Sequence, residues 1–229
     1  MTTTTAAFAW DAIKGWERLG LKHHDKVAAF VEADRKISEY IAESEPHLPS
    51  LADPETIVEA IEAHAEHLAL REGHNSPVSQ AISKARTTVA HNGIRAGREN
   101  VDHYRDQLTA RFDKAAEVYV RESAKLPETF TGDDLAGFDT DTFAAYQAVK
   151  QAAAEIRSVR DWLSSLSQIL PGSSLTDYRP QFLVLDPGST EVFSAVQHAV
   201  PASADRIYEA VDPVMLKAVK AGAELRMAT

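Results

Sequence analysis

The chain contains no cysteine, which excludes disulfide bonds, thiolate nucleophiles and metal sites that depend on cysteine ligands. It also has no run of about 18 uninterrupted apolar residues, the length that a membrane-crossing helix needs. The first residues, MTTTTAAFAWDAIKGW, lack the basic segment and apolar core of a secretory signal. We therefore expect a protein without a membrane partner, not secreted by a signal peptide, in the cytoplasm or within an assembled particle.

Glycine and proline are also scarce, with ten of each in 229 residues, and they stand at the boundaries between segments. Positive charge is in deficit, since the formal net charge is −10. This argues against a protein that wraps nucleic acid, because phosphate binding needs a basic face. A hydrophobic content of 44% and a charged content of 25% are those of an ordinary folded protein.

What the sequence does have is helical periodicity, with apolar residues at steps of three and four over most of its length. We predict helices over residues 6–44, with a break near LGLKHHD, and then over 54–72, 77–125 and 140–170. Ser76-Pro77 and Asp212-Pro213 have the form of helix starts. Gly93 and Gly97 lie within one predicted helix, where we expect a kink or a close contact with another helix.

The helix over residues 140–170 has the clearest pattern in the chain. Its apolar positions alternate steps of four and three for more than three heptads, as in a coiled-coil seam: Ala145, Val149, Ala152, Ile156, Val159, Leu163, Leu166 and Leu170. The sequence therefore predicts a mainly α fold. We expect a long antiparallel helical bundle or coiled-coil hairpin of residues 77–125 and 140–170, with the N-terminal helices packed along it.

The C-terminal part has a different character and is expected to be a small α+β region. Residues 181–185, QFLVL, form the one convincing strand, and short helices follow over 190–199, 202–211 and 213–226. An unpaired strand is costly to bury, so its partner is either a strand near ETFTG or another chain. We divide the chain into an N-terminal helical arm (1–50), a helical bundle or hairpin (51–172) and this C-terminal region (173–229).

The segment EAIEAHAEHLALREGHN, residues 59–75, concentrates histidines and carboxylates and so invites a metal-site interpretation. At about 100° per residue, one stripe contains Ile57, Ile61, His64 and Leu68, which we expect to face the core. Glu59, Glu62 and Glu66 then point to solvent, away from His64 and His67. Because neither Glu-x-x-His nor His-Glu-x-x-His occurs in register, we predict no metal ligands, no cofactor and no catalytic residues.

Charge is segregated along the chain. Residues 43–72 carry eight acidic side chains against one basic, whereas residues 73–98 carry no acidic side chain and four basic ones: Lys84, Arg86, Arg95 and Arg98. Either the two segments pair as an antiparallel hairpin through the GHNSP turn, or the basic stripe HNGIRAGR binds an acidic partner. The stripe has no interleaved aromatic residues, which argues against nucleic acid.

Aromatic residues gather at the N-terminus, where Phe8, Trp10 and Trp16 lie close together in sequence. They either dock this segment onto the core of the chain or anchor it in a neighbouring subunit.

The sequence has no P-loop, dinucleotide-binding or nucleophile-elbow motif. We therefore predict a non-enzymatic structural or assembly protein that acts through helix–helix contacts, as a homo-oligomer or a component of a larger particle, for example in phage or virion assembly. The candidate interaction residues are Phe8, Trp10, Trp16, Arg95 and Arg98. The alternatives are a regulatory module whose basic stripe binds an acidic partner, and a helical-bundle metal protein using His64 and His67 with His91 or His103.

Overall fold

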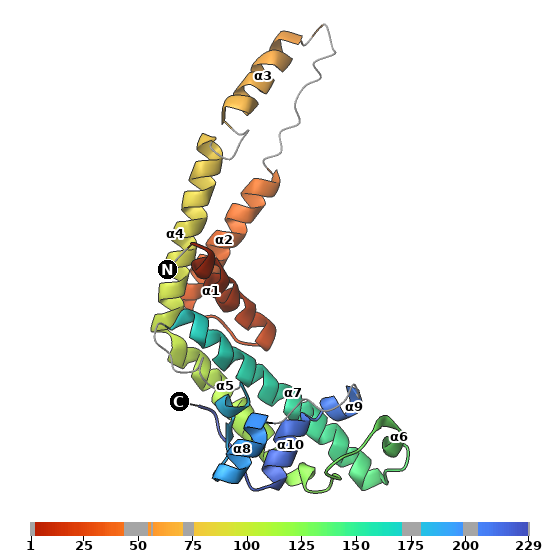
Figure 1. Ribbon diagram of the computed structural model, residues 1–229. Helices are drawn as coiled ribbons and strands as arrows, with labels where there is room; N and C mark the ends of the chain where they lie inside the picture. Colours follow the sequence, from red (N-terminus) through yellow and green to blue (C-terminus); the bar gives the residue numbers. More distant parts are fainter. Residues whose placement is uncertain are drawn as a thin grey trace. The chain divides into compact units, whose positions relative to one another are not determined.

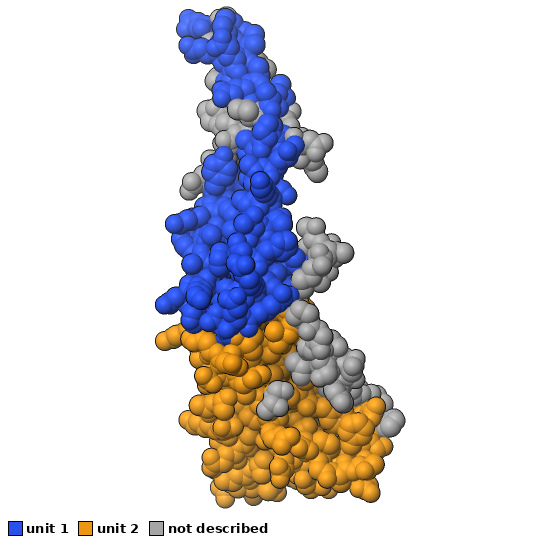
Figure 2. Space-filling model, turned by 90° about the vertical axis from the view of Figure 1, so that its left-hand side faces the viewer, with its two compact units in different colours: residues 1–14, 23–100 blue, residues 15–22, 101–229 orange. Residues whose placement is uncertain are grey.

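The computed structural model describes residues 3–43, 55, 57–70, 76–170, 180–198 and 206–228. These residues form a mainly helical protein with a small two-stranded antiparallel sheet (Figure 1), which confirms the predicted fold class at this level. The chain divides into two compact units, coloured separately in Figure 2: residues 1–14 with 23–100, and residues 15–22 with 101–229. The division into segments 1–50, 51–172 and 173–229 stays a prediction.

Unit 1 is built from four helices among the described residues: α1 (Thr3–Gly15), α2 (Asp25–Glu43), α3 (Ile57–Leu70) and α4 (Pro77–Glu99). The predicted break near LGLKHHD is confirmed, since α1 is followed by the 3₁₀ helix η1 (Trp16–Leu19) and α2 begins only at Asp25. The start of α4 is also as predicted, because the Ser76 hydroxyl accepts a hydrogen bond of 3.2 Å from the Ser79 amide. Residues 71–75 lie outside the described residues, and they include most of the proposed GHNSP turn.

A notch of two glycines on α4 receives α1. A Cβ atom added at Gly93 would lie 2.2 Å from the ring of Trp10, and one at Gly97 would lie 2.7 Å from Cδ1 of Ile13. Trp10 and Ile13, the two side chains of α1 that enter this notch, are buried. Only glycine allows the helices to approach this closely, so the expected close helix contact is confirmed.

The predicted single helix over residues 77–125 is wrong, because it is interrupted at Asn100. Its side chain donates a hydrogen bond of 2.7 Å to the Ala96 carbonyl, and its backbone amide bonds to Gly97 at 3.3 Å. An asparagine that satisfies the backbone locally in this way competes with the helix. The next helix, α5 (Val101–Ser123), begins directly afterwards and belongs to unit 2.

Unit 2 is centred on α5 and α7, and the other elements lie around this pair. These elements are η1, α6 (Gly132–Leu135), η3 (Pro180–Leu183), β1 (Leu185–Asp186), α8 (Thr190–His198), α9 (Arg206–Glu209), α10 (Pro213–Lys220) and β2 (Glu224–Leu225). The helix α7 spans Thr140–Ile169, very close to its predicted range. Its start is capped by Asp139, which accepts a hydrogen bond of 2.7 Å from the Thr142 amide.

The predicted apolar row of α7 is buried up to Leu166, and Leu170 lies just beyond the helix. The row packs against α5, which lies beside it in Figure 1. The helices run antiparallel, because Arg111 of α5 pairs with Glu155 of α7 at 2.6 Å while Tyr104 and Trp162 both contact Trp16. The coiled-coil-like row is therefore covered within its own unit.

Side chains of α5 form hydrogen bonds with the backbone of the segment that follows α1. Gln107 bonds to both the amide and the carbonyl of Lys22, at 2.8 and 2.9 Å, and His103 Nε2 lies 3.1 Å from the same carbonyl. Arg111 donates to the Leu19 carbonyl at 2.8 Å. Polar side chains of α5 thus fix the backbone just before and at the start of the KHHD break.

The predicted strand over residues 181–185 is mostly a 3₁₀ turn, η3, and only Leu185–Asp186 form a strand. Its partner is β2, with Leu185 opposite Leu225 and Asp186 opposite Glu224, and not the ETFTG segment. Since β1 is paired within the chain, it no longer argues for a second chain.

The glycine notch makes a test of the α1–α4 contact. Gly93→Ala would stabilise an uncovered helix by about 1 kcal/mol, but the clash with Trp10 should instead lower the free energy of unfolding by about 1–3 kcal/mol. Urea denaturation measures the sign. Gly15→Ala is the control, because nothing lies within 4 Å of a Cβ atom there. A stabilised Gly93→Ala protein would show that α1 does not occupy the notch.

Candidate interaction surface

Helix α3 carries a stripe of exposed apolar side chains. Val58, Ile61 and Leu68 are 66%, 55% and 53% exposed. At about 100° per residue they fall within roughly 80° of one another, so they form one continuous face. Ala60, on another side of the helix, is fully buried. We call Val58, Ile61 and Leu68 the α3 stripe.

This exposure corrects the expectation that Ile57, Ile61, His64 and Leu68 face the core. Ile61 and Leu68 are more exposed than buried, while the covered side of α3 carries the small residue Ala60. The apolar residues do recur at helical spacing, but apolar spacing alone does not say whether a partner covers the face. In the described residues of this chain, the α3 stripe has no such cover.

The acidic residues of α3 continue around the helix from this stripe. Glu59, Glu62 and Glu66 are all exposed, as predicted, and α3 contains no lysine or arginine. Among the described residues, none of these three carboxylates takes part in an ion pair. The exposed surface of α3 thus has an apolar face, the α3 stripe, beside an acidic one.

A groove of about 670 Å³ runs between α1, α2 and α4 in unit 1. Its apolar wall includes Trp10, Ile41 and Ile82, and its polar wall carries hydroxyls of both α2 and α4, those of Ser38, Ser79, Ser83 and Thr87. Two cations, Lys14 and Arg86, and two aspartates, Asp11 and Asp34, line the same groove. An amphipathic surface of this kind suits an amphipathic occupant.

The two cations of the groove differ in their partners. Lys14 is bound to Asp34 at 2.7 Å and Asp11 at 3.0 Å. Partial burial alone would lower the pKa of Lys14, but its hydrogen bonds and the charges of both aspartates outweigh this and raise it. Arg86 is exposed and, among the described residues, no carboxylate pairs with it. Arg86 is therefore available to an acidic partner.

Basic side chains form an exposed row along α4 beside the groove. Lys84, Thr88, His91 and Arg95 recur at steps of four, three and four, so they share one face of the helix. We call Lys84, His91 and Arg95 the basic stripe of α4. His91 also lines the groove, which places the stripe along its border.

Of the five candidate interaction residues, the structure exposes Phe8, which is 64% exposed, and Arg95. Arg98 is half-buried. Trp10 is buried in the α4 notch, and Trp16 is buried beside Tyr104 and Trp162, where its indole donates to Ser165 at 3.0 Å. The two tryptophans thus dock the N-terminal segment within the chain. Arg86, which the sequence placed among the basic residues but not among the candidates, lines the groove.

The histidines do not gather into a metal site in the part of the chain that the structure describes. No three histidine, aspartate or glutamate side chains there are arranged to hold a metal ion. His103 is engaged with the Lys22 carbonyl, and His91 lies exposed on α4. Across the same residues, no helix is both long and apolar enough to cross a membrane.

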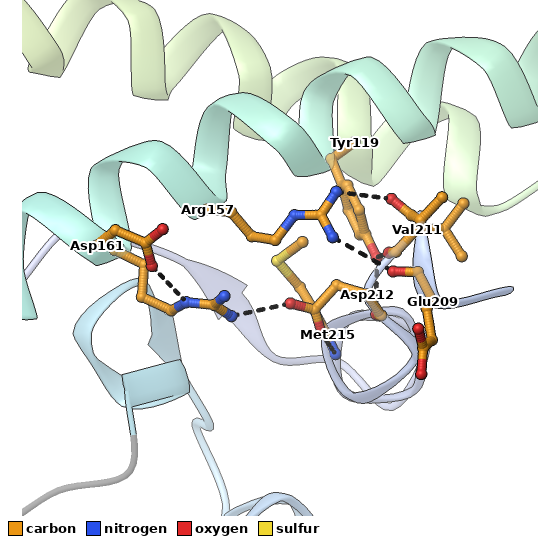
Figure 3. Close-up of polar contacts among 9 residues, drawn as sticks. Tyr119, Arg157, Asp161, Glu209, Val211, Asp212 and Met215 are labelled. Atoms are coloured by element: carbon orange, nitrogen blue, oxygen red, sulfur yellow. Dashed lines mark hydrogen bonds and ion pairs between the residues drawn. The ribbon is translucent and has the colours of Figure 1, made fainter. Parts of the chain in front are cut away.

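A dense polar cluster joins α5, α7 and the turn before α10 (Figure 3). The phenol of Tyr119 donates to the Val211 carbonyl at 2.6 Å, and Arg157 donates to the Ala210 carbonyl at 3.1 Å. Arg160 pairs with Asp212 at 3.0 Å, and these side chains are only 17% and 11% exposed. Most of these bonds end on backbone carbonyls, so the cluster fixes the turn in place.

Asp212 is the centre of this cluster. It has a left-handed backbone, with φ of 56°, directly before Pro213, and its carboxylate caps α10 by accepting from the Met215 amide at 3.2 Å. A left-handed conformation outside glycine is unfavourable, and aspartate is among the residues that tolerate it best. The predicted helix start at Asp212-Pro213 is confirmed, but the ion pair between Asp212 and Arg160 could not be predicted from the sequence.

Comparison of the chain with families of known proteins, with curated proteins and with solved structures finds no match.

Asp212→Ala removes the cap and leaves Arg160 without its partner, so the free energy of unfolding should fall by about 2–4 kcal/mol. Asp212→Asn keeps a side-chain oxygen for the cap, so its free energy of unfolding should decrease by about half as much. Urea denaturation compares the two with Asp161→Asn, a control 66% exposed whose removal should change stability by less than about 0.5 kcal/mol. Equal losses for Asp161→Asn and Asp212→Ala would contradict this account.

Tyr119 predicts a loss of stability at alkaline pH. Burial, together with the charge of Asp212, raises the pKa of the Tyr119 phenol well above its usual range, so folding favours the neutral form. Its contribution is complete below the ordinary tyrosine pKa of about 10 and is lost as the pH rises from there toward the raised value. The free energy of unfolding of the Tyr119→Phe protein should therefore decrease less steeply above about pH 10 than that of the wild type.

At neutral pH the same substitution leaves the buried Val211 carbonyl without its donor, which should cost about 1–3 kcal/mol. Tyr40→Phe, at an exposed position, is the control and should keep the wild-type pH profile. Parallel alkaline profiles for the wild type and Tyr119→Phe would show that the phenol does not stay neutral.

Proposed function

We propose that this protein is a non-enzymatic assembly protein that self-associates through helix faces, as a homo-oligomer or as a component of a larger particle. The observation that carries the proposal is the α3 stripe, three large apolar side chains on one exposed face. Contiguous apolar surface of this kind marks interaction sites in folded proteins.

The distribution of exposed apolar side chains supports the same proposal. Eight large ones are exposed among the described residues, and six of them lie in unit 1: Phe8, Tyr40, Ile41, Val58, Ile61 and Leu68. Unit 2 exposes only Val120 and Phe143. Unit 1 is therefore the part that we assign to assembly, with unit 2 as its scaffold.

Within this proposal, α5 and α7 form the rigid part of the scaffold, with a coiled-coil-type seam between them. The continuous burial of the α7 row and the Arg111–Glu155 ion pair support it. The predicted helical hairpin is limited in this proposal to α5 and α7, because α4 ends at Asn100 before α5 begins.

The energetics show that the α3 stripe alone is too small an interface. Full burial of one such side chain stabilises by about 1.5–3 kcal/mol, and the three are only partly exposed, so covering them gains roughly 3–5 kcal/mol. Association loses about 4–15 kcal/mol of translational and rotational freedom. A specific complex therefore needs further contacts, which the other exposed residues of unit 1 can provide.

The mass in solution tests the proposal. Light scattering or sedimentation at tens of micromolar should give a mass at least twice that of the 25.1 kDa chain, decreasing on dilution. The double substitution Val58→Ser with Leu68→Ser should shift the mass toward the monomer, because it removes apolar area from the stripe. Val120→Ser, at the exposed apolar position of α5, should leave the mass unchanged. A wild-type protein that stays monomeric would contradict the proposal.

A further inference from the structure

We propose that α3 of one copy docks in the groove between α1, α2 and α4 of a second copy, with its acidic flank against the basic stripe of α4. This inference rests on the proposed self-association and names the two surfaces that make it. It assigns the groove one occupant, an amphipathic acidic helix that this chain itself supplies.

The apolar halves of the two surfaces match. The α3 stripe presents Val58, Ile61 and Leu68 on one face, and the groove offers Trp10, Ile41 and Ile82 on its walls. A helix that lays an apolar row into a groove is a common recognition mode, with anchors spaced by three, four and seven residues. Ile61 and Leu68 have the seven-residue spacing, and Val58 lies three residues before Ile61.

The charged halves carry opposite signs. Glu59, Glu62 and Glu66 recur at steps of three and four, and Lys84, His91 and Arg95 lie on positions separated by seven and four residues. Each row therefore follows one face of its helix, and the basic row, eleven residues long, extends beyond the seven residues of the acidic row. Arg86 adds a cation inside the groove, where Lys14 is already neutralised by two aspartates.

The position of His91 connects the two halves into one surface. Because it belongs both to the groove and to the basic stripe, the stripe forms a border of the groove. A helix with an apolar face and an adjacent acidic flank fits this border in one orientation about its axis. On α3 the two faces are adjacent in this way, since Val58 and Glu62 are separated by roughly 40° at 100° per residue.

A second copy is the occupant that the charges favour. Among the described residues, no ion pair joins the acidic residues of α3 to the basic residues of α4 within one chain. The two opposite rows of one sequence are then both available for contacts between copies. Electrostatic complementarity of this kind sets register and speeds association.

Charge reversal with rescue tests the pairing. Glu62→Lys with Glu66→Lys should weaken self-association about tenfold, and Lys84→Glu with Arg95→Glu should do the same. An equimolar mixture of the two variants should recover the association, because each reversed row meets its complement on the other protein. Asp113→Lys with Glu117→Lys on α5 is the matched control, with the same spacing and charge change, and should associate as the wild type does.

Because the chain has no cysteine, single cysteines report the contact directly. Ala65→Cys on α3 and Ser83→Cys in the groove, mixed as separate proteins under mild oxidation, should form a cross-linked heterodimer. Ala65→Cys mixed with Ala110→Cys, at an exposed position of α5, should not. The double variant A65C/S83C distinguishes contacts within one chain, which appear as an oxidised monomer.

The outcomes separate this inference from the proposed function. Heterodimer cross-linking together with charge rescue supports both. A wild-type oligomer that neither cross-links nor responds to charge reversal overturns the α3–groove contact and leaves self-association standing. An oxidised monomer of A65C/S83C without heterodimers assigns the groove to α3 of the same chain and overturns the inference, and a monomeric wild type overturns both.

Discussion

Each amphipathic helix of this protein must cover its apolar face, and the way each does so decides which surface is left for partners. The helix α7 covers its row against α5, and α1 covers Trp10 and Ile13 in the glycine notch of α4. The strand β1 likewise finds its partner in β2. By contrast, α3 leaves its stripe exposed although its spacing equals that of a core helix, and α2 leaves Tyr40 and Ile41 exposed. The α7 row, the N-terminal tryptophans and the strand are thus partnered within the chain, which leaves the α3 stripe as the surface on which the proposed assembly depends.

Much of the fold could be predicted because its signals are local. Ser76 and Asp212, each before a proline, cap the helices that they were expected to start, through hydrogen bonds of 3.2 Å to the amides three residues later. The α7 row was predicted from Ala145 to Leu166, since a three–four alternation over so many turns has few other interpretations, and only Leu170 lies outside it. Gly93 and Gly97 were recognised as a place of close approach because glycine inside a helix is unfavourable without such a reason.

What could not be predicted depends on contacts distant in sequence. Asn100 ends α4 in the middle of a periodic segment, and the apolar spacing continues across it without a sign of the break. The partner of β1 comes from the last turn of the chain, where no strand pattern was visible. The candidate surface could not be predicted for the same reason: Arg86 lines a groove that α1 and α2 form with α4, and the spacing of the α3 stripe does not show that it stays exposed.

The geometry of the proposed contact also limits the assemblies that it can build. The α3 surface and the groove are different surfaces, so a one-way contact is heterologous and leaves one of each free on the outer copies. Such contacts continue until they close into a ring, or they extend as an open chain. A reciprocal pair, in which each copy inserts α3 into the groove of the other, uses both surfaces at once and stops at two copies. Because the contact energy of the α3 stripe alone is too small to overcome the entropy of association, the reciprocal pair has an advantage: it forms two contacts for a single loss of translational freedom. Growth beyond two copies therefore requires additional surface, and in unit 1 the exposed side chain of Phe8 lies outside the groove and is free to provide it.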